Sequence, residues 1–210
     1  MISPFRYPKI KHLRTQLPPQ FNNYRRYKPV LKVEFSGQCV YCRALDSLRG
    51  EETFGVDHYR PKKLYPALEV EYFNLYYACN RCNSLKGGFW PSLEQSARGH
   101  FVPNPCEHVM FEHLKFQGGA VQSSSPAGDW TVEKLLLNDS RVVAFRNAVI
   151  QAHSALLQKS DGVKKTISFI ERKLLNPKSK DESELLTSKL ANAQRNLSEL
   201  EAATKQFEVS

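Results

Sequence analysis

The chain has 210 residues, of which 41% are hydrophobic, and its 30 basic and 21 acidic residues give a formal net charge of +9. It contains no apolar run of the roughly 18 or more residues that cross a bilayer, and its N-terminus lacks an apolar signal region. We therefore expect a soluble, cytoplasmic protein with no membrane contact, folded as one moderate domain or as a domain with an appendage.

Positive charge is concentrated in residues 1–34, which we expect to form a basic N-terminal arm. Residues 1–33 include eight lysines and arginines and no acidic residue. Basic side chains attract the phosphate backbone of nucleic acids without reading sequence, so we expect Arg25 and Arg26 to contact DNA. Prolines and tyrosines interleaved with these charges leave an alternative open, in which the arm wraps along the domain with its aromatic rings packed inward.

The main domain is expected over residues 35–130 and contains two CxxC motifs, Cys39 with Cys42 and Cys79 with Cys82. Two cysteines spaced in this way can bind one ion from a tight turn, and two such turns supply the four ligands of a tetrahedral zinc site. A redox pair or buried free thiols are the alternatives. Cys106 is left over and is expected to be a small buried side chain.

The 36 residues between the two motifs contain secondary structure of their own. Residues 53–58 have apolar side chains at alternate positions and indicate a short strand that ends before Arg60-Pro61. After the second motif, the sequence NSLK is typical of the first turn of a helix, which Gly87-Gly88 keeps short. Adjacent strand residues point to opposite faces, so we expect a bend at Asp57-His58 that lets both side chains reach one ion.

Three pieces of this segment, DHYRP, NL and CNRCNSLKG, together resemble the HNH endonuclease family, whose ββα-metal core binds one catalytic divalent cation. The resemblance covers residues 35–90. It implies that His58 is the general base and that Asn74 orients this histidine. It also implies that Asp57 and Asn83 are ligands of the catalytic cation. The four cysteines match a structural zinc site that some members of the family keep.

These residue types suit the hydrolysis of a phosphodiester bond. A histidine side chain has an ordinary pKa of about 6.5, so it is mostly neutral at neutral pH and can accept a proton from water. Asp57 and Asn83 offer hard oxygen ligands, which favour Mg²⁺ or Mn²⁺ over Zn²⁺. Arg60, Lys62 and Lys86 are candidates for contact with the DNA backbone; the alternative is that they are solvated charges.

Beyond the core, residues 91–131 are expected to form loops, with a small hairpin around Gly118-Gly119 and a flexible connection over SSSPAGDW. Residues 131–210 show the period of amphipathic helices and predict two long helices joined near NPKSKD, packed as an antiparallel hairpin. The apolar stripe of this region has two interpretations. It packs within the chain, or it also forms a surface for homodimerisation or for docking a partner.

The expected fold is therefore α+β: a ββα-metal HNH core stapled by a four-cysteine zinc site, followed by a helical hairpin. The order of DHYRPK, NLYYACNRCNSLKG, PNPC and LLLND is also similar to the HNH component of Septu-type and retron-linked anti-phage systems. This resemblance implies a companion ATPase that docks on the helical region. A packaging-associated or restriction-type HNH nuclease is one alternative, and a non-catalytic zinc module that binds nucleic acid is another.

Overall fold

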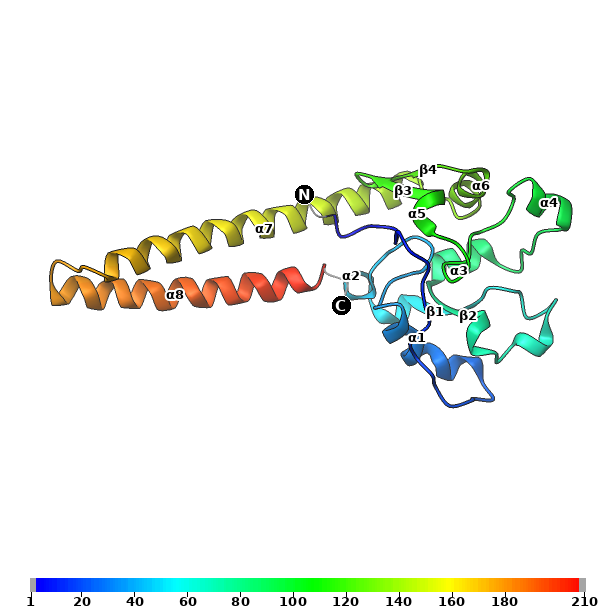
Figure 1. Cartoon of the computed structure of the whole chain (residues 1–210), viewed down its shortest axis with the longest axis horizontal. Helices are drawn as coiled ribbons and strands as arrows, with labels where there is room; N and C mark the ends of the chain where they lie inside the picture. The colour runs from blue at the N-terminus through cyan, green and yellow to red at the C-terminus, as the bar shows by residue number, and fades with distance from the viewer. Residues whose placement is uncertain (1–2, 208–210) are drawn as a thin grey trace. The chain divides into compact units, whose positions relative to one another are not determined.

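The computed structural model describes residues 3–207, and it confirms the expected mixture of helices and small antiparallel sheets. The chain divides into two compact units, a globular unit that ends at Ala148 and a helical unit that begins at Val149. This boundary lies inside a helix that both units share, so residues 131–148 belong with the globular unit (Figure 1). Within the described residues, no helix is both long and apolar enough to cross a membrane.

The secondary-structure elements follow one another in a simple order. The strands are β1 (Phe54–His58), β2 (Leu75–Cys79), β3 (Leu114–Gln117) and β4 (Ala120–Ser123). The α-helices are α1 (Lys28–Glu34), α2 (Asp46–Arg49), α3 (Asn80–Lys86), α4 (Leu93–Ala97), α5 (Met110–His113), α6 (Pro126–Lys134), α7 (Ser140–Leu174) and α8 (Lys180–Lys205). Short 3₁₀ helices are η1 (Tyr24–Tyr27), η2 (Glu51–Thr53), η3 (Pro66–Leu68) and η4 (Tyr72–Asn74).

The sheet of β1 and β2 forms the centre of the globular unit. Every residue of β2 is buried, as its apolar and aromatic composition favours. On the side of β2 away from β1, the backbone N–H of Val40 donates to the carbonyl of Tyr77 at 3.0 Å. Strand β1 pairs only with β2 among the described strands, so no strand covers its other edge.

The N-terminal arm lies along the globular unit with its aromatic rings packed inward. Tyr7 is 4% exposed and stacks on Phe116, and its hydroxyl donates to the carbonyl of Tyr41 at 2.8 Å. Arg14 places its guanidinium over three aromatic rings, among them Phe35 at 4.7 Å. The interpretation that this arm is wrapped on the domain is therefore confirmed, and the cation–π contacts help to hold it there.

Glu34, at the end of α1, is the main anchor of the arm. Its buried carboxylate accepts hydrogen bonds from the backbone N–H groups of Thr15 and Gln16 and from the hydroxyl of Tyr72, and it pairs with the His12 ring. Burial opposes ionisation, but the bonds from Gln16, Thr15 and Tyr72 outweigh it and lower the pKa of the Glu34 carboxyl to about 2. The carboxylate is thus charged and fully used in holding the arm.

Residues 91–139 contain more regular structure than the sequence predicts. The hairpin at Gly118-Gly119 is confirmed by the pairing of β3 with β4. The flexible connection expected over SSSPAGDW is wrong, because α6 begins there. The Ser125 hydroxyl accepts from the N–H of Gly128, and Pro126 occupies the first helical turn, where it needs no hydrogen-bond partner.

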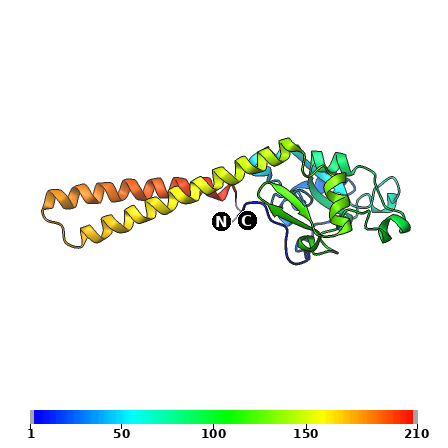
Figure 2. The same cartoon turned by 90° about the horizontal axis from the view of Figure 1, so that it is seen from above.

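The helical unit is a hairpin of α8 and the greater part of α7, which lie side by side and antiparallel (Figures 1 and 2). Helix α7 continues without interruption through Asp161-Gly162. The buried apolar residues of this unit are Val149, Ile170, Leu186 and Leu200. Lys164 on α7 and Glu201 on α8 form an ion pair at 3.2 Å across the seam.

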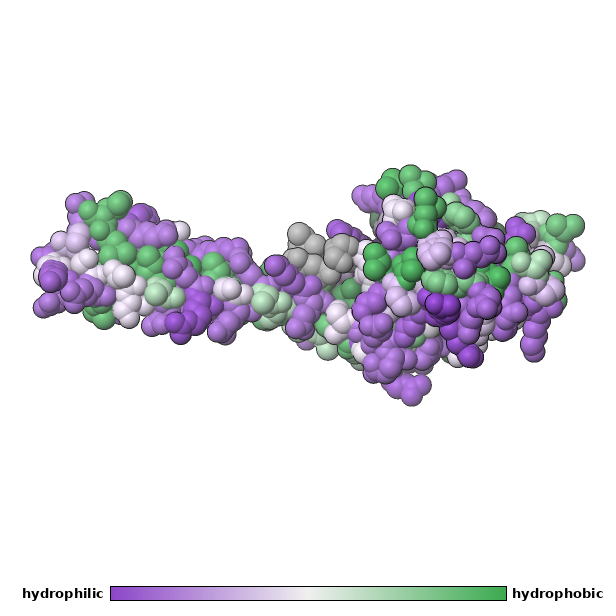
Figure 3. Space-filling view, turned by 90° about the horizontal axis from the view of Figure 1, so that it is seen from below, coloured by the Kyte–Doolittle hydropathy of each residue, from purple (hydrophilic) through white to green (hydrophobic). Residues whose placement is uncertain are grey.

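The end of the hairpin where α7 meets α8 has an apolar surface (Figure 3). Phe169, Leu175 and Leu185 are 52%, 77% and 55% exposed there. Homodimerisation through this region stays a prediction.

Glu34→Gln should destabilise the globular unit by about 2 kcal/mol at pH 7, because charge-assisted bonds to the arm become neutral ones. The folded-state pKa of about 2 lies below the ordinary value of 4.5, so this contribution is present above pH 4.5 and disappears as the pH falls toward 2. Urea denaturation of wild type and variant at pH 7, 5 and 3 measures it. Exposed Glu133→Gln is the control. A Glu34→Gln effect that stays constant across this range would contradict the account.

Candidate metal and active site

The four cysteines of the two CxxC motifs come together in one cluster. Cys39 and Cys42 lie on a tight turn closed by Arg43, whose backbone has a φ of 58° and whose N–H donates to the Cys39 carbonyl. Cys79 ends β2 and caps α3, which carries Cys82. All four sulfur atoms lie within 4.8 Å of one another, and all four residues are buried.

The geometry of this cluster fits a zinc ion. Zinc–thiolate bonds of about 2.3 Å in a tetrahedron place sulfur atoms about 3.8 Å apart, and the Sγ atoms of Cys42 and Cys79 are separated by 3.7 Å. Hydrogen bonds from Cys39, Cys79 and Cys82 lower the pKa of Cys42, whereas burial raises the pKa of Cys39. A buried cluster in which some cysteines favour the charged thiolate form needs a cation to neutralise that charge. The predicted four-cysteine metal site is thus supported by the arrangement of its ligands.

Helix α3 holds the unpaired edge of β1 with two side chains one turn apart. The Asn83 amide donates to the Val56 carbonyl at 3.3 Å, and the Lys86 ammonium donates to the His58 carbonyl at 2.7 Å. These two carbonyls belong to alternate strand residues and therefore point the same way. Gly55 also faces α3, since a Cβ added to it would come 3.4 Å from the Asn80 side chain and 4.0 Å from that of Asn83. The cysteine cluster fixes the start of α3, and these two bonds fix its direction along β1.

Asp57 and Lys86 form a buried ion pair at this junction. The Lys86 ammonium is 3.1 Å from Oδ1 of Asp57, and each residue is 2% exposed. The hydroxyl of Tyr41 donates to Oδ2 of Asp57 at 2.5 Å. Lys86 therefore lies in the interior in this structure, and its contact with nucleic acid stays a prediction.

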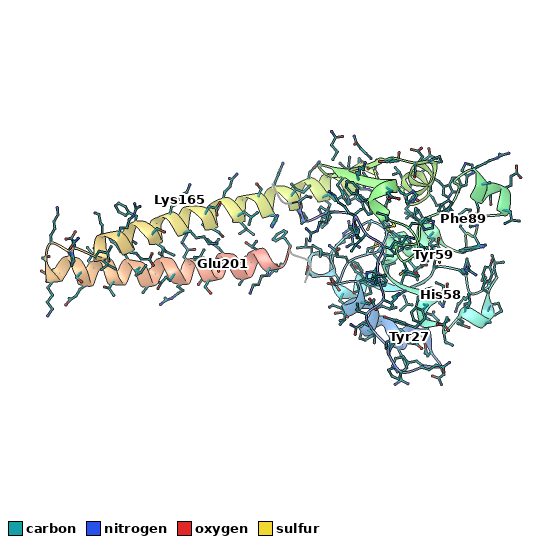
Figure 4. All side chains as sticks on the ribbon, in the orientation of Figure 1. Tyr27, His58, Tyr59, Phe89, Lys165 and Glu201 are labelled. Carbon is teal, nitrogen blue, oxygen red and sulfur yellow. The ribbon has the colours of Figure 1, made fainter. Side chains whose placement is uncertain are left out.

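His58 lies on the face of β1 opposite to Asp57. The two residues continue a regular antiparallel ladder, paired with Leu75 and Tyr76 respectively, so the bend expected between them is wrong. The strand keeps its period of two because both neighbours are held by β2 and by α3. Figure 4 labels His58 next to Tyr59, which follows β1 in the globular unit.

The His58 ring is half-buried and has two neighbours. Its Nε2 is 2.9 Å from the carbonyl of Glu69, and its ring packs edge-on against Tyr24 with centroids 4.6 Å apart. A carbonyl only accepts, so Nε2 carries the proton and Nδ1 of the neutral ring keeps its lone pair. Burial lowers the pKa of His58 from 6.5. The ring is consequently held as a neutral base with a defined tautomer.

Asn74 stabilises the chain just after His58 and makes no direct bond to the imidazole. Its Oδ1 accepts from the N–H of Arg60 at 2.8 Å, and its Nδ2 donates to the Arg60 carbonyl at 3.0 Å. The same Nδ2 is 3.2 Å from the carbonyl of Leu68. The orienting contact predicted for Asn74 is thus made to the backbone, whereas Glu69 orients the ring.

A hollow of about 290 Å³ lies beside the unpaired edge of β1. It is lined by Tyr24, Arg25, Lys28, Gly55, Val56 and Asn83. Arg25 and Asn83 are far apart in the sequence and were predicted as site residues for different reasons. Both line this hollow. Tyr24 joins this hollow to His58, since its ring contacts the imidazole.

The other predicted nucleic-acid contacts lie around this region with different partners. Arg26 is exposed and stacks on Phe21. Lys62 forms an ion pair with Glu69 at 2.8 Å and covers the Tyr24 ring. Sequence reasoning did not find the roles of Tyr24 and Glu69, because neither belongs to a motif and both reach His58 only through the tertiary fold.

Removal of the metal from the cysteine cluster should unfold the globular unit. Structural zinc contributes on the order of 10 kcal/mol in small sites, so a strong chelator should lower the melting midpoint by at least about 10 °C. Cys82→Ser should bind less than one zinc per chain and melt early. Cys106→Ser, which lies outside the cluster, is the control and should keep its zinc. A melting curve that the chelator leaves unchanged would count against the site.

Lys86→Met should destabilise the globular unit by about 3 kcal/mol, because it leaves the Asp57 carboxylate buried without its cation. Denaturant unfolding in the presence of zinc measures this, with exposed Lys63→Met as the control. Adding Asp57→Asn to Lys86→Met should recover part of the loss, since both charges are then gone. Equal effects of Lys86→Met and Lys63→Met would show that the pair contributes nothing.

Comparison with known proteins identifies two relatives. No family model matches the chain, and no solved structure matches it. It is 30% identical over 162 residues to the Septu protein PtuB of Bacillus mycoides (strain KBAB4), which covers 64% of this chain and 54% of that protein. It is 30% identical over 116 residues to the Septu protein PtuB of Bacillus thuringiensis, which covers 53% of this chain and 42% of that protein. The chain thus spans about half the length of the curated relatives it matches, and its likeness to Septu proteins agrees with the resemblance that its motifs indicate.

Proposed function

We propose that this chain is a metal-dependent endonuclease that hydrolyses phosphodiester bonds of DNA and acts in a Septu-type anti-phage defence system. The observation that carries the nuclease assignment is the junction of β1 and α3. It holds a neutral histidine, an amide oxygen and basic side chains within one region. The defence assignment is supported by the two relatives named Septu protein PtuB.

In this proposal His58 is the general base. Its Nε2–H donates to the Glu69 carbonyl, so Nδ1 is the atom that takes a proton from the attacking water. Tyr24 packs against the ring and limits its rotation. The bond to Glu69 also stabilises the imidazolium that forms when the proton arrives, because a carbonyl oxygen favours the charged donor.

A catalytic Mg²⁺ or Mn²⁺ fits the chemistry of the donors at this junction. Asp57 and Asn83 supply a carboxylate and an amide oxygen, the hard ligands that these ions prefer. The ion would supply charge stabilisation for the phosphoryl oxygens and for the leaving oxygen. The Nδ2 of Asn83 donates to the Val56 carbonyl, so its Oδ1 is the atom that would bind the ion. In this structure Oδ1 of Asp57 accepts from Lys86 and Oδ2 accepts from Tyr41, so binding of the ion would require Lys86 to release Oδ1 and keep its bond to the His58 carbonyl.

Basic side chains near the hollow would hold the DNA backbone. Arg25 lines the hollow and Arg26 is exposed beside it in the sequence. Lys28 also lines the hollow, although its ammonium donates to the Glu51 carbonyl at 2.9 Å. Contacts of this kind bind phosphate without reading bases, so we expect little sequence preference.

The helical hairpin is proposed to dock the companion ATPase that the resemblance to Septu-type systems implies. Its exposed Phe169, Leu175 and Leu185 give an apolar surface at the end where α7 meets α8. Exposed apolar patches of this kind are typical of interaction sites.

His58→Ala should lower the rate of plasmid DNA cleavage in Mg²⁺ or Mn²⁺ by about 100-fold or more, because a general base contributes factors of that size. The variant should keep its zinc and its DNA affinity. His100→Ala is the control, since the His100 ring stacks on Trp130, with centroids 4.7 Å apart. Cleavage should be assayed with and without the companion ATPase. Equal cleavage by His58→Ala would reject His58 as the base, and DNA binding without cleavage under both conditions would favour a non-catalytic zinc module.

A further inference from the structure

A cationic platform follows β1 directly after the candidate active site. Arg60 is exposed, and its guanidinium centre lies 5.4 Å from the ring centroid of Trp90 and 5.7 Å from that of Tyr65. Trp90 in turn meets buried Tyr59 edge-on, with centroids 5.5 Å apart at 90°. Tyr65 meets Trp90 at 5.6 Å and 74°. The guanidinium is therefore backed by rings that are anchored in the core.

The backbone of Arg60 is also fixed. The Asn74 amide bonds both the N–H and the carbonyl of Arg60, which leaves little freedom at its Cα. The pocket that Trp90 lines together with Tyr59 and Phe89 has a volume of only about 10 Å³. Such preorganisation reduces the entropy lost when a ligand binds.

The charge of Arg60 has no acidic partner. Within residues 3–207, none of the ion pairs includes Arg60, whereas its neighbour Lys62 is paired with Glu69. A cation–π contact with a purely structural role would stabilise the fold by about 0.5–1 kcal/mol. It would do so even if an acidic side chain also paired with the guanidinium.

We propose that Arg60, backed by Trp90 and Tyr65, is a stacking platform for an unpaired base, so that the preferred substrate has single-stranded character at the cleavage point. Guanidinium planes and aromatic rings bind bases that are free of their own duplex stack. Arg60 lies two residues after His58, so their Cα atoms are at most about 7 Å apart. A base on the platform would thus keep its phosphate near the proposed general base. This inference rests on the proposed function only in naming the substrate of that site.

Tryptophan fluorescence tests the platform without any need for cleavage. The chain has two tryptophans, and Trp130→Phe leaves Trp90 as the reporter. The Trp130 indole N–H is buried without a hydrogen-bond partner, so this change removes no bond of that group. In zinc-loaded His58→Ala/Trp130→Phe protein, we would titrate oligothymidylate and a duplex of equal length. The single strand should quench Trp90 and bind at least about tenfold more tightly than the duplex.

Two further variants of that protein separate stacking from general charge. Arg60→Ala should weaken binding of the single strand about tenfold, which corresponds to roughly 1.4 kcal/mol and agrees with the stacking of one base. Lys63→Ala removes one exposed positive charge next to the platform without touching an aromatic ring, and should weaken binding far less. Circular dichroism and zinc content establish that each variant is folded.

The outcomes decide the proposal independently of catalysis. Equal losses for Arg60→Ala and Lys63→Ala, an unquenched Trp90, or duplex bound as tightly as single strand would each overturn the platform. If the platform behaves as expected but wild-type protein cleaves no nucleic acid with its companion present, the proposed nuclease function fails and the platform stands. If wild-type protein cleaves duplex and single strand equally, the nuclease stands and the inferred substrate preference fails.

Discussion

The hold of α3 on the unpaired edge of β1 is the interaction on which the rest of the site depends. A two-stranded sheet has two edges, and a strand edge left without partners binds water or other chains. Here Asn83 and Lys86 bond the carbonyls of Val56 and His58, and Lys86 also neutralises Asp57. The same contacts that complete the sheet therefore place the polar groups of the candidate site. A substitution that breaks these contacts should therefore disturb both the edge of the sheet and the position of the site's polar groups.

The cysteine cluster makes this arrangement possible in a short segment. Cys79 ends β2 and caps α3, so one residue joins the metal site, the sheet and the helix. Cys39 and Cys42 bring in a turn whose Val40 N–H bonds the far edge of β2. A core of two short strands buries little surface by itself. The four-cysteine cluster and the arm anchored on Glu34 supply further constraints on this small core.

Much of this fold follows from local sequence signals. Two CxxC motifs, the alternation before His58 and the glycines after Lys86 predict the cysteine cluster, β1 and the end of α3. The signals that failed are those that depend on tertiary neighbours. The burial of Lys86 follows from the facing Asp57, and the orientation of His58 follows from the Glu69 carbonyl. Helix α6 was missed because a run of serines before Pro126 resembles a linker, although Ser125 is its N-cap. The catalytic and nucleic-acid-binding roles stay predictions.

A diffraction experiment with manganese-soaked crystals tests the central claim most directly, because anomalous scattering identifies each metal by its absorption edge. The account predicts a zinc signal among the sulfur atoms of Cys39, Cys42, Cys79 and Cys82, and a separate manganese signal at the junction of β1 and α3 beside Asp57 and Asn83. A zinc signal alone, with Lys86 still bonded to Asp57 at high manganese concentration, would contradict a catalytic metal at this junction.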